Sequence, residues 1–113
     1  MANVFVSKKV DLTTTDVTTL YTVPSATTAI VKSILVSDDS GSGSTITIQI
    51  ATSLDATFSV AHVKTIAANT PTEILTHPLV VETGEIIQVT AGNANRLHVI
   101  LSAMQVTPRT VVS

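Results

Sequence analysis

The chain has 113 residues, which is the length of a single domain. Only 12% of the residues are charged and the net charge is −2, so the sequence lacks the basic surface that nucleic-acid binding requires. It contains no cysteine, which excludes disulfide bonds and thiolate metal sites, and no apolar run approaches the roughly 18 residues of a membrane helix.

In chain order, apolar and polar residues alternate over short runs that are separated by turn residues, and no helical period occurs. The segment 1–17 is expected to be an N-terminal arm or edge strand, 18–106 a β-sandwich, and 107–113 a C-terminal tail. The pattern predicts an all-β fold, a single two-sheet sandwich of about seven or eight antiparallel strands, of jelly-roll or immunoglobulin-like type. Beyond the first segment, the expected strands are 18–23, 28–37, 45–51, 58–66, 73–76, 86–91 and 96–106, and 79–81 is a short apolar step.

Two pairs of neighbouring strands look like hairpins. Runs 28–37 and 45–51 flank a polar loop with two glycines, which is a hairpin signal. The loop 92–95 has the same kind of turn chemistry between the last two strands. In the run 58–66 the alternation slips at Val63, which indicates a bulge or a curved edge strand.

The strand 28–37 is apolar on both faces, with Ile30, Ile34 and Val36 expected on one of them. A strand with one wet face would alternate more strictly, and interface cores are depleted in charge. We therefore expect this strand and the last one to contact other subunits. The residues expected at that interface are Ile30, Lys32, Ile34, Val36, His98, Ile100 and Met104.

The sequence offers no recognisable catalytic or ligand-binding motif. The spacing of the three histidines matches no short metal-ligand pattern. Asp38 and Asp39 resemble the start of a calcium loop, but position twelve of that pattern is Gln49 where Glu is needed, so a solvated turn is expected there. We expect no enzyme activity, no cofactor, no metal and no small-molecule substrate.

Three stretches together resemble a known family. They are Asp11–Thr14 continuing through Leu20–Pro24, then Ala29–Ser37, then Leu79–Glu85 before Ile86. Together they look like the small β-sandwich virion proteins of tailed bacteriophages, and the resemblance covers about residues 11–106. The shared motifs are turns and core positions, so no catalytic residue carries over.

The resemblance implies a virion structural protein, made in the host cytoplasm and located on the capsid surface. The leading hypothesis is a capsid decoration (cement) protein that is a homotrimer, binds the major capsid protein and stabilises contacts between capsid subunits. Neither nucleic acid nor a membrane is an expected partner. A neck, tail or fibre component is the first alternative. A glycan-binding or cell-surface module is the second, and the scarcity of aromatic residues, 3% of the chain, argues against it.

Overall fold

The computed structural model describes residues 2–38, 40–52 and 56–107. This part of the chain contains nine strands and no helix. The strands are β1 (Ala2–Leu12), β2 (Thr18–Thr22), β3 (Thr28–Asp38), β4 (Ser44–Ala51), β5 (Thr57–Ile66), β6 (Pro71–Glu73), β7 (Leu79–Val81), β8 (Ile86–Ala91) and β9 (Leu97–Thr107).

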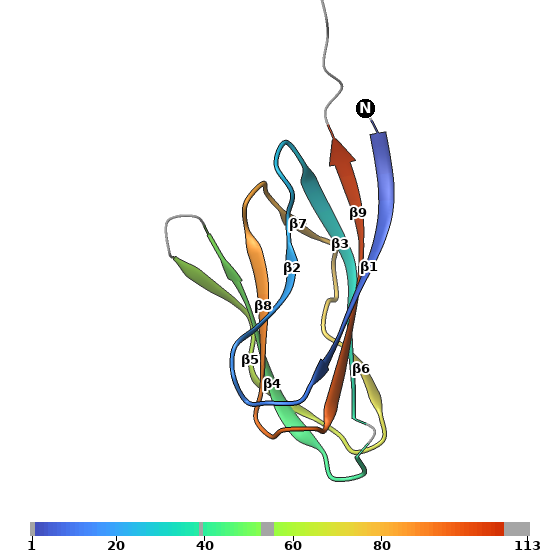
Figure 1. The fold of residues 1–113 in the computed structure, drawn as a ribbon. Helices are drawn as coiled ribbons and strands as arrows, with labels where there is room; N and C mark the ends of the chain where they lie inside the picture. The colour runs from blue at the N-terminus through green and yellow to red at the C-terminus, as the bar shows by residue number, and fades with distance from the viewer. Residues whose placement is uncertain (1, 39, 53–55, 108–113) are drawn as a thin grey trace, which may run out of the picture.

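The strands form two antiparallel sheets that pack face to face (Figure 1). Sheet A has the order β1-β9-β3-β6, with β7 also paired to β3, and sheet B has the order β2-β8-β4-β5. The predicted all-β two-sheet sandwich is therefore confirmed. The first segment of the chain supplies β1, which lies at one edge of sheet A and pairs with β9 along its whole length. Residue 107, where the tail was expected to begin, is the last residue of β9, and 108–113 lie outside the described residues.

The pairing of the strands identifies the topology as a jelly roll. The first half of the chain pairs with the second half in reverse order: β1 with β9, β2 with β8, β3 with β6 and β7, and β4 with β5. Such a chain is one long antiparallel ribbon, doubled back at β4–β5 and rolled into two sheets. Counting β6 and β7 as one interrupted strand gives the eight strands of this fold.

Both predicted hairpins are wrong. β3 belongs to sheet A and β4 to sheet B, and β9 and β8 are divided in the same way. The loop after β3 and the loop Gly92–Arg96 therefore cross from one sheet to the other. Positive φ angles at Gly41, Gly43 and Asn95 turn the chain there, and the same turn chemistry that closes a hairpin also allows a crossing.

A bulge in β3 decides which of its side chains face the core. The register with β9 shifts between Val31 and Ser33, so that Lys32 is the extra residue and the alternation changes phase there. The inward side chains are Ala29 and Val31 before the bulge, and Ile34 and Val36 after it, and all four are completely buried. The bulge predicted near Val63 is confirmed: the β4–β5 register shifts on either side of Ile48, and Val63 has a φ of 47°.

The core lies between the sheets and is made almost entirely of aliphatic side chains. β-branched residues supply most of them, because these side chains pack well on a pleated surface. The largest fully buried residues are Leu12, Val23, Val31, Ile34, Val36, Ile46, Ile48, Ile66, Val81, Ile87, Leu97 and Leu101.

The bulge can be tested by comparing two isoleucines of β3. Ile34→Ala is expected to lower the free energy of unfolding by about 2–5 kcal/mol, because it leaves a cavity in the core. Ile30→Ala, on the other face of the strand, is expected to cost about 1 kcal/mol or less. Urea denaturation followed by circular dichroism measures both. Equal losses for the two variants would contradict the change of phase at Lys32.

Candidate interaction surface

The outer face of sheet A carries apolar side chains in two rows, together called here the sheet A face, and a row of serines, Ser7, Ser102 and Ser33, lies between the two. The register brings Phe5, Met104, Ile30 and Val80 side by side across four strands, β1, β9, β3 and β7. Further along the strands, Ile100 and Leu35 are opposite each other in a second row. Phe5 is 76% exposed and Val80 59%, so much of this surface faces solvent.

The outer face of sheet B has a different chemistry. Thr47 and Thr90 face each other across β4 and β8, and Gln49 donates a hydrogen bond to Gln88 with an Nε2 to Oε1 distance of 2.8 Å. These hydroxyl and amide groups can be satisfied by water or by each other. The outer face of sheet B is thus polar at its centre, whereas the sheet A face presents two apolar rows beside serines and charged groups, and those apolar rows are the candidate for contact with a partner.

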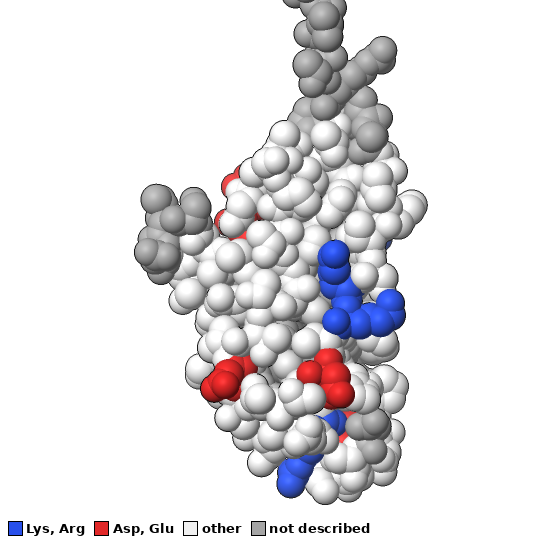
Figure 2. All heavy atoms as spheres, in the orientation of Figure 1, with Lys and Arg blue, Asp and Glu red and all other residues white. Residues whose placement is uncertain are grey.

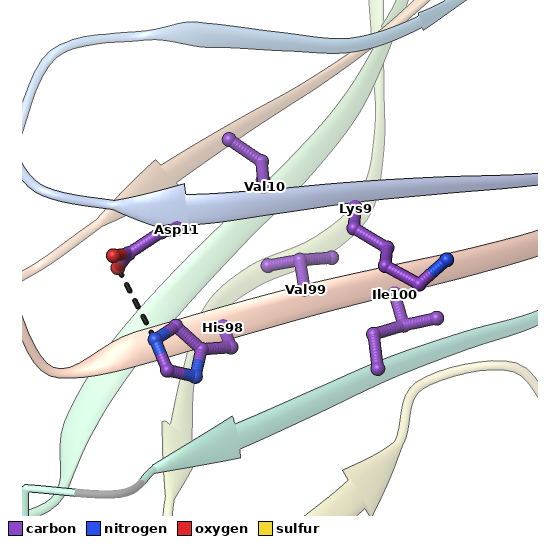
Figure 3. A pocket seen from close by; sticks show the side chains of 6 residues that line it. All are labelled: Lys9, Val10, Asp11, His98, Val99 and Ile100. Atoms are coloured by element: carbon purple, nitrogen blue, oxygen red, sulfur yellow. Dashed lines mark ion pairs between the residues drawn. The ribbon is translucent and has the colours of Figure 1, made fainter.

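Charged groups also lie on the outer face of sheet A, at Lys9 and Asp11 of β1 and at Lys32 in the bulge of β3. Figure 2 shows Lys or Arg side chains at mid-height on the side where Figure 1 draws β1, and Asp or Glu side chains below them. Lower down, Asp11 and His98 lie on the same side of β1 and β9, with 3.3 Å between Oδ1 and Nε2 (Figure 3). The side chains of His98 and Asp11 are 42% and 61% exposed, so this pair contributes little to stability.

Two shallow hollows mark this face, one toward the C-terminal end of β1 and one beside its middle. The lower one, about 290 Å³, contains the Asp11–His98 pair beside Lys9 and Ile100 (Figure 3). The upper hollow, of the same volume, is lined mainly by β1 and β9, with Phe5 on its rim and Lys32 beside it. Neither is enclosed enough to bury a small molecule, whereas an apolar side chain of a partner could fit either.

Five of the seven residues predicted for an interface are at the surface. Ile30, Ile100, Met104 and His98 are partly exposed on the sheet A face, and Lys32 is exposed at the bulge. Ile34 and Val36 are completely buried between the sheets, which corrects their assignment. The reason is the bulge, because it places both side chains on the face opposite that of Ile30.

Three residues of the sheet A face were missed in the sequence. Leu35 was expected on the other side of β3, and only the change of phase at the bulge brings it beside Ile100. Phe5 and Val80 belong to short apolar runs that carry no sign of which sheet they join. Phe5 lies between Val4 and Val6 in the sequence, so alternation along a strand predicts that its side chain points to the face opposite theirs.

The described residues contain no group of three or more His, Cys, Asp or Glu side chains that could hold a metal ion. They also contain no helix long and apolar enough to cross a membrane. Asp38, expected in a solvated turn, is instead 3% exposed, which corrects that expectation.

The carboxylate of Asp38 holds the loop between the two sheets. Its Oδ1 accepts hydrogen bonds from the Ser40 hydroxyl at 2.7 Å and from the Ser40 backbone N–H at 2.6 Å. The Ser40 hydroxyl is the main cause of a lowered pKa of Asp38; burial opposes this, and the backbone N–H groups of the turn add to the lowering. On the far side of the loop, Arg96 donates a hydrogen bond to the Gly43 carbonyl at 3.0 Å. The ionised carboxylate is thus a structural anchor.

Comparison with protein-family models and with curated protein sequences gives no match for this chain.

The role of Asp38 predicts a dependence of stability on pH. Because its pKa is lower in the folded protein, the carboxylate stabilises the fold fully above its ordinary pKa of 3.8, and this contribution is lost as the pH falls through the folded-state value. Asp38→Asn is therefore expected to be less stable than wild type at pH 7, with the difference shrinking toward pH 3. Denaturant unfolding at both pH values measures it. Asp16→Asn, at an exposed position, is the control, and an equal effect of the two substitutions would contradict this role.

Proposed function

We propose that this protein is a non-enzymatic structural component of a bacteriophage virion, and that it decorates the head by binding the major capsid protein. The observation that carries the proposal is the sheet A face, on which apolar side chains, among them the exposed Phe5 and Val80, gather in rows, while the centre of the other outer face is polar. Exposed apolar side chains that gather on one face are typical of protein–protein contacts. The resemblance of three stretches of the sequence to phage virion proteins supplies the class of partner.

The fold supports the proposal without deciding it. Jelly-roll sandwiches occur in viral capsid proteins, and also in lectins and cupins, so the topology fits several functions. The chemistry of the surface is more selective. Lectin sites need polar and aromatic groups that converge on a sugar, whereas the sheet A face presents aliphatic side chains with Phe5 as its only aromatic residue.

The proposed action is stabilisation by binding to the assembled shell. A protein that binds capsid subunits only when they are joined shifts the equilibrium toward the assembled state. The sheet A face would cover part of a joint between subunits, and its aliphatic side chains would lose water there. The apolar rows suit such a contact, because the cores of interfaces are depleted in charge, and the Asp11–His98 pair would lie toward its rim.

A substitution on each outer face tests which surface binds the particle. Ile100→Glu places a charge in the middle of the sheet A face and is expected to reduce binding to particles stripped of this protein by at least about tenfold. Thr90→Glu places the same charge on the outer face of sheet B and is expected to bind like wild type. Co-sedimentation with the particles measures both. Loss of binding in the second variant alone would reject the sheet A face as the contact.

The location of the protein in the virion is tested by its number of copies per particle and by the thermal stability of the particles. A decoration protein is expected in many copies over the shell, and particles lacking it should release their DNA at a lower temperature. About a dozen copies or fewer, as at a ring-shaped vertex, would indicate the neck, tail or fibre instead. Quantitative mass spectrometry and a dye-release melt give the two results. Absence of the protein from purified virions would overturn the proposal.

A further inference from the structure

β1 presents a long open edge of sheet A. It pairs with β9 on one side over all eleven residues, and on the other side no strand of the described chain pairs with it. Apart from the Asp11 carbonyl, which accepts a hydrogen bond from the Thr13 N–H at 3.0 Å, the backbone groups along that side are available to another strand. Such an edge is a template for pairing with a further chain unless bulges, proline or charge protect it.

The other edges of the sandwich are poorly suited to pairing. β5 has ten residues but is interrupted by register shifts, and β2 has five residues with a shift of its own. β6 and β7 have three residues each. Within the described residues, β1 is thus the one edge that is both long and regular.

We propose that β1 pairs in antiparallel fashion with β1 of a second copy of this chain, about a two-fold axis through Ser7. A two-fold axis that relates antiparallel strands of one continuous sheet is perpendicular to that sheet, so outward residues face outward residues. Ser7 is the middle residue of the strand Ala2–Leu12, and this register therefore uses the full length of both edges.

The side chains on the outer face are complementary in this register. Asn3 lies opposite Asp11 of the second copy, where an amide can donate a hydrogen bond to a carboxylate. Phe5 lies opposite Lys9, a cation–π pair, and each of these pairs occurs twice by symmetry. Centring the pairing on Lys8 or Lys9 instead would place like charges directly opposite each other, which is unfavourable.

The inner side of the strand also fits this register. Val4 faces the inside of the sandwich by alternation, since it pairs with Gln105, yet it is 50% exposed. In the dimer it lies opposite Val10 of the second copy. Val6 lies opposite Lys8, so the two Lys8 side chains are diagonal neighbours and do not face each other. The association covers apolar surface that the single chain leaves in water.

This pairing would place two sheet A faces side by side in one continuous sheet, with Asn3, Ser7, Lys9 and Asp11 of both copies along the seam. It does not depend on the proposed function, because it concerns the protein alone and is measured without capsids. It differs from the homotrimer expected from the sequence, and the molar mass in solution distinguishes the two.

A single cysteine at the axis tests the geometry. The chain has no cysteine, and opposite residues of paired strands have Cα atoms about 4.5–5.5 Å apart, within reach of a disulfide. Ser7→Cys is therefore expected to oxidise to a disulfide-linked dimer in nearly full yield. Ser59→Cys, at an exposed position on the edge strand β5, is the matched control and should remain mostly unlinked. Equal yields, or no linked dimer from Ser7→Cys, would overturn the proposed axis.

A charge exchange tests the register. Phe5→Lys puts a lysine opposite Lys9 of the second copy and is expected to weaken the dimer by about tenfold or more. Phe58→Lys makes the same chemical change at an exposed phenylalanine of β5 and should leave the dimer unchanged. Adding Lys9→Glu to Phe5→Lys is expected to restore the dimer, because a lysine then faces a glutamate across the axis.

Analytical ultracentrifugation of the wild type and the three variants measures the association, and circular dichroism checks that each variant is folded. The wild type is expected at twice the 11.8 kDa mass of the chain. A wild-type mass of one or three chains would overturn the proposal. So would failure of the double variant to associate more strongly than Phe5→Lys.

Discussion

The position of β9 between β1 and β3 is the constraint on which the sandwich depends. β9 is the last strand, and it pairs with the first and third strands over nearly their whole lengths. β1 and β9 come from opposite ends of the described chain. Sheet A can therefore form only when the antiparallel ribbon folds back and brings these two strands together. The inward side chains of β9, which are Leu97, Val99 and Leu101, are completely buried. Their packing against sheet B stabilises the position of β9 between β1 and β3. The loss of chain entropy is large, and burial of aliphatic surface offsets it.

A second constraint is the phase of each strand. In a strand, a shift of one residue exchanges the core face and the solvent face. The bulge at Lys32 makes this exchange within β3, so Ile34 and Val36 become core residues while Leu35 joins Ile30 on the surface. One extra residue thus lets an almost continuous apolar run serve both the interior and the sheet A face. The surface on which the proposed function rests depends on this irregularity.

The two outer faces show how a chain with few charges divides its polar groups. Sheet B places threonine and glutamine outward, with the amides of Gln49 and Gln88 bonded to each other. Sheet A places aliphatic side chains outward in two rows, with charged groups beside them on β1, β3 and β6, such as Lys9, Lys32 and Glu73. Charge at an edge strand limits unspecific pairing with other chains. The two outer faces therefore differ in the share of apolar side chains that they present.

The sequence by itself determined the all-β class, the approximate strands and the bulge near Val63, because alternation and turn residues are local signals. It also placed Ile30, Ile100 and Met104 at the surface that the structure presents. The pairing of strands was decided only by the tertiary structure, since the loops after β3 and β8 suit a hairpin as well as a crossing between sheets. The tertiary structure also decided which face of β3 carries Ile34 and Val36. A bulge exists only relative to the partner strand, and pairing with β9 places it at Lys32, before these two residues.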